Sequence, residues 1–378
     1  MTDIKLPHKF NSAKQTDTSS AMVSVIVPIY NAAPYLDQAL FSVQDQTHVN
    51  LEIICLNDGS TDNSLEIMKE HATADSRIVV IDKPNEGYGA TCNRGFDAAH
   101  GNWIAILEPD DWIEPTMFKD MLEFANSFTS IKQIIDVIKT PYWSIINADT
   151  PHERKIACRY KGRIKPLRQP FTLQDATRLI RHRPSIWSAL YRTDFIRSHN
   201  IRFVEAPGAG WADNPFLYET LCRANGIAYL DTPYYCYREE SPDKTALFAR
   251  NTPFVAFDRW NEMTDILEQL DIIDPDIWGA HCKRGLNYIR LVTDIIGFDN
   301  DRVKTAVVSM LKRMPEKTVY AEAEISPHNK RFYAQLLDLP EPSISSISYT
   351  KTLIAEGIAS LRNAGLRETI RQMKSVSS

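Results

Sequence analysis

The amino-acid sequence predicts an α/β protein in which a mostly parallel sheet flanked by helices is followed by an α-helical C-terminal region. Between residues 23 and 139, short β-branched runs alternate with helix-period segments, which is typical of parallel sheets covered by helices. From Pro253 onward, proline and Asp or Asn signals separate helical segments. The chain has 378 residues and 43% hydrophobic content, enough for one large domain with extensions or for two domains.

The N-terminal region contains four predicted buried strands. They cover residues 23–27, 51–55, 78–81 and 103–107. Between the first two, apolar residues recur at the i, i+3, i+4, i+7 spacing of one amphipathic helix, at Leu36, Ala39, Leu40 and Val43. Pro34 suits the first turn of that helix.

The other regions differ from this alternating pattern. Residues 1–22 are polar and are expected to form a flexible N-terminal extension, and residues 141–250 are irregular and rich in proline and aromatic side chains. Residues 251–378 are expected to be helical, with helices at 253–270, 275–297, 299–314, 328–338 and 351–374.

Composition excludes several classes of protein. A net charge of -5 and a pI near 6.0 argue against a protein that coats nucleic acid, because neutralising phosphates requires concentrated Lys and Arg. The six cysteines are far apart, without a CxxC pair, and are expected to be reduced. The first 22 residues lack the apolar segment of a signal peptide, and no run reaches the ~18 apolar residues of a membrane span. We therefore expect a cytoplasmic protein.

Polar side chains follow three of the predicted strands. Open α/β sheets bind their ligands at the carboxyl ends of the strands, so these residues are candidates for the site. Asp110 and Asp111 follow the fourth strand. Such carboxylates could hold Mn or Mg, which commonly bind one or two carboxylates plus substrate phosphates. Alternatively, they cap the helix that begins near Pro115. Asp58, before Gly59, has two possible roles. It either stabilises a turn or accepts a hydrogen bond from a nucleotide base or a ribose hydroxyl.

Four segments taken together resemble the family-two glycosyltransferases. They are VSVIVPIYN at 23–31, EIICLNDGSTDNS at 52–64, NEGYGATCNRGFDAAHG at 85–101 and ILEPDDW at 106–112. The resemblance spans roughly residues 23–125 and implies a GT-A fold of the inverting, bacterial surface-glycan type. It also implies a UDP-sugar donor and a divalent cation, with residues 23–140 as the donor-binding half and 141–250 as the acceptor-binding half.

The resemblance further implies roles for individual residues. Those expected to contact the donor are Pro28, Tyr30, Asn31, Asp58, Asn85, Gly87, Asn93 and Asp110. Within this set, Asp58 is expected at the uracil, and Asp110 near the ribose or the donor sugar. Asp111 is expected to ligate the metal. Glu108 stands where an aspartate is commoner, so its role stays open.

Asp213 is the expected general base, which would deprotonate the acceptor hydroxyl. The family typically has an acidic pair here, whereas this chain has Ala212 and Asp213. The alternative is that Asp213 only N-caps a helix over 214–223, and Glu205 is the second candidate base. Three aromatic side chains are expected to bind the acceptor: Trp187, Tyr191 and Trp211. For Trp187, the alternative is a place in the hydrophobic core.

The predicted helix 351–374 combines apolar residues with five Lys or Arg and two Glu. It is expected either to lie on an anionic membrane, at the inner face of the cell membrane, or to pack on the protein or a second subunit in a homo-oligomer.

The predicted reaction is inverting transfer from a UDP-sugar to a hydroxyl of a growing glycan. That glycan is expected to be capsule, lipopolysaccharide or another cell-surface polysaccharide, free or lipid-linked, and no nucleic acid is expected to bind. One alternative is a catalytically degenerate subunit that binds nucleotide or glycan. A sugar nucleotidyltransferase is disfavoured, because residues 28–34 lack glycine, lysine and arginine.

Overall fold

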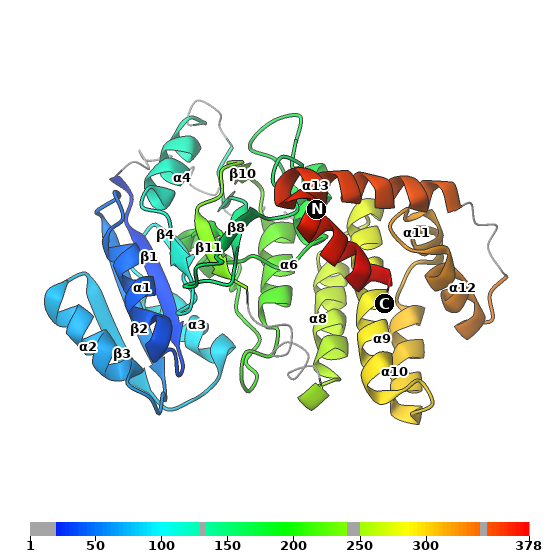
Figure 1. The fold of residues 1–378 in the computed structure, drawn as a ribbon, viewed down its shortest axis with the longest axis horizontal. Helices are drawn as coiled ribbons and strands as arrows, with labels where there is room; N and C mark the ends of the chain where they lie inside the picture. The colour runs from blue at the N-terminus through cyan, green and yellow to red at the C-terminus, as the bar shows by residue number, and fades with distance from the viewer. Residues whose placement is uncertain (1–19, 129–132, 240–249, 341–345, 378) are drawn as a thin grey trace, which may run out of the picture.

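The computed structural model describes residues 20–128, 133–239, 250–340 and 346–377. Its main sheet has seven strands in the order β10-β6-β9-β4-β1-β2-β3 (Figure 1). Their bounds are β1 Val23–Ile29, β2 Leu51–Asp58, β3 Ile78–Lys83, β4 Trp103–Ile106, β6 Val137–Lys139, β9 Ala189–Arg192 and β10 Ile227–Tyr229. All pairings are parallel except those of β9, which runs antiparallel to β4 and β6. The predicted fold class and the four predicted strands are confirmed.

Helices cover this sheet, which is why β1 is buried along its whole length. The N-terminal helices are α1 Ala33–Gln44, α2 Ser64–Ala74, α3 Tyr88–Ala98 and α4 Met117–Asn126. Helix α1 buries the predicted apolar face, and its proline lies in the first turn. The main sheet takes β9 and β10 from the region that looked irregular in sequence, so both expected halves contribute strands to it.

A second sheet lies at the carboxyl end of β4. It has four strands in the order β5-β11-β7-β8, with bounds β5 Trp112–Ile113, β11 Tyr235–Arg238, β7 Tyr142–Ile146 and β8 Arg154–Ala157. Sequence periodicity did not predict these strands, because they are short and partly exposed. Three short helices complete this region: η2 Leu173–Ile180, α5 Thr193–Ser198 and α6 Asp213–Arg223.

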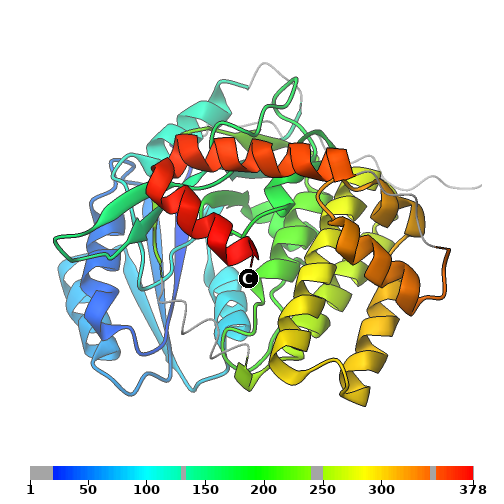
Figure 2. The same ribbon diagram turned by 45° about the vertical axis from the view of Figure 1, so that its right-hand side comes forward.

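The C-terminal region is helical, as predicted. Its helices are α8 Val255–Gln269, α9 Pro275–Ile296, α10 Asp301–Lys312, α11 Glu316–Ala321, α12 Pro327–Leu336 and α13 Ser346–Ser377. Side chains of Asp274, Asn300 and Ser326 accept hydrogen bonds from backbone N–H groups at the starts of α9, α10 and α12. Figures 1 and 2 show α13 lying across the other helices and kinking back, with the kink at Gly365, where φ is 78°.

Two further features of the described residues bear on the sequence predictions. All six cysteines are free thiols. Among the helices in these parts of the chain, none is long and apolar enough to cross a membrane.

Candidate active site

The loops after β1 and β2 are tied together. Asn31 adopts a left-handed backbone with φ of 50°. Its side-chain oxygen accepts a hydrogen bond of 2.8 Å from the Thr61 N–H, and its own N–H donates to the Ser60 hydroxyl at 3.1 Å. Tyr30 beside it is 52% exposed, whereas Pro28 is buried inside β1. Tyr30 and Asn31 are therefore open to a ligand, whereas Pro28 is not.

Asp58 lies at the end of β2 in a buried ion pair with Lys83. Its carboxylate also accepts hydrogen bonds from the N–H groups of Glu86 at 2.8 Å and Gly87 at 3.0 Å. Both carboxylate oxygens thus have protein partners. These contacts hold the 84–87 loop, where Asn85 is exposed, above the sheet edge.

Asn93 and Gly87 hold the segment 203–208 against α3. The Asn93 amide donates to the Phe203 carbonyl and to Glu205, both at 3.0 Å, and its oxygen accepts from the Phe203 N–H at 2.9 Å. At Gly87, where φ is 89°, a Cβ would come within 2.4 Å of the Ala206 carbonyl oxygen. The Asn93 amide is therefore used within the protein rather than facing a ligand.

Glu108 follows β4 and faces the same region as the candidate base. The Tyr88 hydroxyl donates a hydrogen bond of 2.6 Å to it. Burial, together with the charges of Asp110 and Asp213, raises the pKa of Glu108 to about 8, against the opposing effect of the hydrogen bond from Tyr88. The charges of Glu108, which follows β4, and of Asp213, at the start of α6, thus affect one another.

Asp110 and Asp111 have different surroundings. Asp111 is 1% exposed, and its carboxylate accepts hydrogen bonds from the Tyr235 hydroxyl at 2.9 Å and the Arg238 N–H at 2.7 Å. Burial, with the charge of Asp110 next, raises the Asp111 pKa well above its usual range. Asp110 is only half-buried. Neither residue caps a helix, because α4 has Thr116 at its N-cap position.

Asp213 is the first residue of α6. Ala212 occupies the N-cap position, and no side chain caps the helix, so the capping alternative for Asp213 is wrong. Burial raises the pKa of Asp213 to about 6, against the opposing charges of Arg284 and Arg183. A carboxyl group that loses its proton near neutral pH suits general-base chemistry. Glu205, the second candidate base, is exposed and bonded to Asn93.

Sequence reasoning missed two residues of α9 that meet the start of α6. Arg284 donates to the Asn214 side-chain oxygen at 2.8 Å and to the Ile180 and His182 carbonyls at 2.7 and 2.8 Å. The Tyr288 hydroxyl donates to the same Asn214 oxygen at 3.1 Å. No motif marks either residue, since a single Arg or Tyr within a helix carries no sequence signal.

The three predicted acceptor aromatics occupy different environments. Trp187 is 5% exposed and stacks on Tyr235 and Tyr237, with ring centroids 4.1 and 5.2 Å away. Tyr191 is 1% exposed and donates to the Ile186 carbonyl. Their burial favours the core role over acceptor contact. Trp211 is half-buried, two residues before Asp213, with its ring centroid 5.5 Å from that of Tyr288.

The carboxylates can accommodate a divalent cation together with a phosphate-bearing ligand. Among the residues that the structure describes, no group of three or more His, Cys, Asp or Glu side chains forms a complete metal cage. Mn or Mg bound to a nucleotide needs only one or two carboxylates, because phosphates and waters supply the rest. Burial is the main cause of the raised pKa of Glu108, and the charges of Asp110 and Asp213 add to it; a bound cation would oppose this smaller, electrostatic part. Asp110 and Glu108, both half-buried, are the best placed to meet it.

Comparison with known sequences gives one family match. Residues 24–187 match the family described as Glycosyl transferase family 2. EpsH of Bacillus subtilis (strain 168), named as a glycosyltransferase without established activity, is 32% identical over 225 residues, or 57% of this chain and 60% of EpsH. YibD of Escherichia coli (strain K12), an uncharacterized glycosyltransferase, is 28% identical over 67% of this chain and 72% of its own length. The chain thus spans about 60% of EpsH.

Among solved structures, similar folds occur in Staphylococcus aureus TarS. Residues 1–349 of TarS in complex with UDP align with a TM-score of 0.63 and 18% identity, covering 84% of this chain and 87% of that one. The complex of the same fragment with UDP-GlcNAc aligns with a TM-score of 0.63 and 19% identity. At this identity the likeness establishes the fold.

Proposed function

We propose that this chain, which belongs through residues 24–187 to glycosyl transferase family 2, transfers a sugar from a UDP-sugar to a hydroxyl of a growing cell-surface glycan. The observation that carries the proposal is that Asp213, at the start of α6, is near enough to Glu108, after β4, for its charge to raise the pKa of Glu108. A donor-side and an acceptor-side carboxylate would then serve one site.

The donor is assigned to the edge formed by β1, β2 and β4. UDP as the nucleotide is supported by the TarS fragment, whose fold is similar and which has been solved with UDP and with UDP-GlcNAc. Tyr30 offers an exposed aromatic ring at this edge. Asp58 contributes by fixing the 84–87 loop through its buried hydrogen bonds, and a direct uracil contact would require these bonds to change.

The cation is assigned to Asp110, with Glu108 beside it. A bound Mn or Mg would neutralise the charge that develops on the departing nucleotide diphosphate. Asp111 is proposed to shape the site rather than to meet the cation, because its oxygens accept hydrogen bonds from Tyr235 and Arg238.

Asp213 is assigned as the base of an inverting reaction. Its carboxylate would take the proton of the acceptor hydroxyl as that oxygen attacks the anomeric carbon and the bond from that carbon to the diphosphate oxygen breaks. Trp211, adjacent in the fold, is the best remaining candidate for stacking on the acceptor sugar.

A donor screen tests the proposal. Purified full-length protein is incubated with a panel of UDP-sugars, beginning with UDP-GlcNAc, together with Mn or Mg and oligosaccharide acceptors, and UDP release is followed. We expect acceptor-dependent UDP release with one donor and loss of that release on chelation. UDP binding without turnover of any donor would favour the degenerate binding subunit instead.

A further inference from the structure

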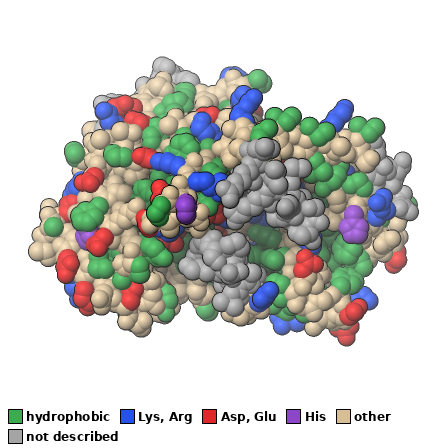
Figure 3. Space-filling model, viewed as in Figure 1, with side chains coloured by type: hydrophobic (Ala, Val, Ile, Leu, Met, Phe, Trp, Pro, Cys, Tyr) green, Lys and Arg blue, Asp and Glu red, His purple; other side chains and the backbone are tan. Residues whose placement is uncertain are grey.

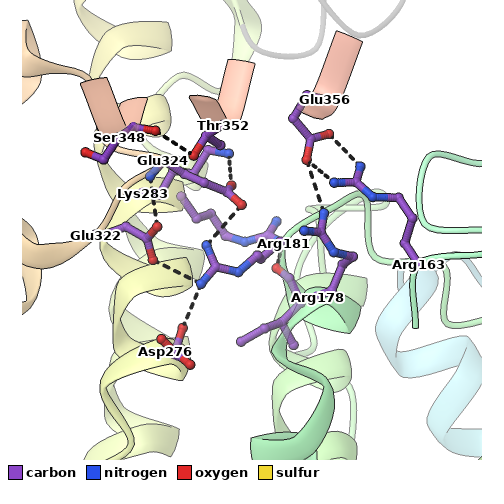
Figure 4. Close-up of polar contacts among 12 residues, drawn as sticks. Arg163, Arg178, Arg181, Asp276, Lys283, Glu322, Glu324, Ser348, Thr352 and Glu356 are labelled. Carbon is purple, nitrogen blue, oxygen red and sulfur yellow. Dashed lines mark hydrogen bonds and ion pairs between the residues drawn. The ribbon is translucent and has the colours of Figure 1, made fainter. Parts of the chain in front are cut away.

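Helix α13 packs with its polar side against the rest of the protein. Glu356 forms ion pairs with Arg163 at 2.5 Å and Arg178 at 3.1 Å (Figure 4). Asn363 donates hydrogen bonds to the carbonyls of Cys158 at 3.3 Å and Lys161 at 3.2 Å. Polar contacts thus hold this helix at Glu356 and Asn363, whereas surface helices usually bury their apolar face.

Five apolar side chains in the described part of α13 are exposed. Their exposed fractions are 64% for Ile347, 44% for Leu353, 58% for Ile354, 59% for Ile358 and 46% for Leu361. Spacings of seven, four and three residues place Ile347, Ile354, Ile358 and Leu361 in one row along the helix. Figure 3 shows hydrophobic side chains gathered along the edge of the molecule where Figure 1 draws α13. An exposed apolar row of this kind marks an interaction surface.

A basic segment lies against the polar side of α13. Residues 158–169 contact α13 through the bonds of Asn363 and the ion pair of Arg163. The segment has no acidic residue and carries Arg159, Lys161, Arg163, Lys165 and Arg168. Among the described residues, Arg159, Lys165 and Arg168 find no ion-pair partner, and all three are exposed. Leu167 between them is fully exposed.

We propose that α13 and the 158–169 segment together form a docking surface for an anionic membrane leaflet. The apolar row and Leu167 would enter the boundary between headgroups and acyl chains, while the basic side chains meet lipid phosphates. Membrane attachment independent of a spanning helix follows from this arrangement.

The charge of the surface favours lipid over a second copy of the chain. Residues 158–169 and 346–365 contain seven Lys or Arg and one acid, Glu356, which is already paired. The whole chain has a net charge of -5, so this basic character is local. Two such surfaces facing each other would bring like charges together, whereas an anionic leaflet complements them.

Vesicle cosedimentation of the full-length protein tests the proposal. Vesicles of phosphatidylcholine alone are compared with vesicles that also contain phosphatidylglycerol. We expect binding to the anionic vesicles only, weakened by added salt because exposed charges are screened. An absence of wild-type binding to the anionic vesicles would overturn the proposal.

Matched variants locate the surface. Ile354→Ser with Ile358→Ser should lower the partition coefficient at least about ten-fold, because two exposed apolar side chains no longer enter the lipid. Lys165→Glu with Arg168→Glu should lower it at least about 25-fold, since each basic residue near an anionic surface contributes roughly five-fold. Ile273→Ser, at a residue that is 90% exposed elsewhere, and Lys69→Glu, also exposed, are the controls and should bind as wild type.

Two outcomes would contradict the lipid assignment. One is that the control variants lose as much vesicle binding as the variants of the proposed surface, which would mean that this surface does not carry the binding. The other is a dimer in sedimentation equilibrium that the Ile354 and Ile358 changes dissociate while vesicle binding is absent, which would assign the row to a second copy. Thermal unfolding of each variant, expected at the wild-type Tm, verifies that the fold is kept.

Discussion

Asn214 donates a hydrogen bond of 3.0 Å from its side-chain amide to the carboxylate of Asp213. The oxygen of the same amide accepts hydrogen bonds from Arg284 and Tyr288 of α9. The carboxylate at the start of α6 is therefore oriented from the C-terminal helical region, which makes that region part of the candidate active site.

Replacing Asn214 with Ala removes this link. We expect kcat to fall by roughly ten-fold or more, because a misoriented base transfers its proton less effectively, while UDP affinity stays at the wild-type value. Steady-state kinetics and calorimetry with UDP measure the two quantities. Since the lost hydrogen bond favours the charged carboxylate, the acid limb of the pH profile should also move to higher pH. A wild-type kcat and pH profile would remove the positioning role.

The wild-type pH profile follows from the raised pKa of Asp213, which is about 6. The ionised carboxylate is the active form of a base, so kcat/KM should rise with pH through about 6 and fall tenfold per pH unit below it. An acid limb near the ordinary pKa of an aspartate would contradict the burial of the Asp213 carboxyl group.

The same raised pKa predicts a stability cost. A carboxyl group whose pKa is higher in the folded state binds its proton more tightly there, so stability is lost as pH rises from the ordinary value of 3.8 through about 6. Asp213→Asn should thus stabilise the protein at neutral pH by on the order of 1–2 kcal/mol, raising Tm by roughly 2–6 °C. The gain should vanish below about pH 4. Calorimetric scans at several pH values measure it, and a lower Tm at neutral pH would refute the account.

Asp110 and Asp111 should respond differently to replacement. Asp110→Asn is expected to weaken metal-dependent UDP binding at least about ten-fold, because the cation loses a charged oxygen ligand. Asp111→Asn should mainly lower stability, by about 1–3 kcal/mol, since an amide cannot accept both hydrogen bonds of the carboxylate. Calorimetric titration of UDP with and without Mn, alongside thermal unfolding, separates the two. Loss of metal-dependent binding in a stably folded Asp111→Asn protein would return the cation to Asp111.

The donor-side fold and the C-terminal helices were predictable because their sequence signals are local. Long buried strands, the apolar face of α1 and the capped C-terminal helices all leave a period in the sequence. Helix α11 is only six residues long, and the strands of the second sheet are two to five residues long, too short to show a period.

The residues of the candidate site could be predicted from the sequence, but the contacts that each of them makes could not. Asp213 and Asp110 follow strands or begin a helix, and the sequence marks such positions. Asp111, Asn93 and Arg284 form hydrogen bonds with partners that are 70 or more positions away in the chain. Sequence spacing carries no record of those contacts, because they arise only when α9 and β11 pack against the site.

The central claim is that Asp213 is the base of the transfer reaction. The most direct test compares acceptor-dependent UDP release by wild-type and Asp213→Asn protein, with the donor that the screen identifies. The account predicts that the variant binds UDP with wild-type affinity while transfer falls by about 10² to 10⁴. Transfer by Asp213→Asn protein at the wild-type rate would contradict it.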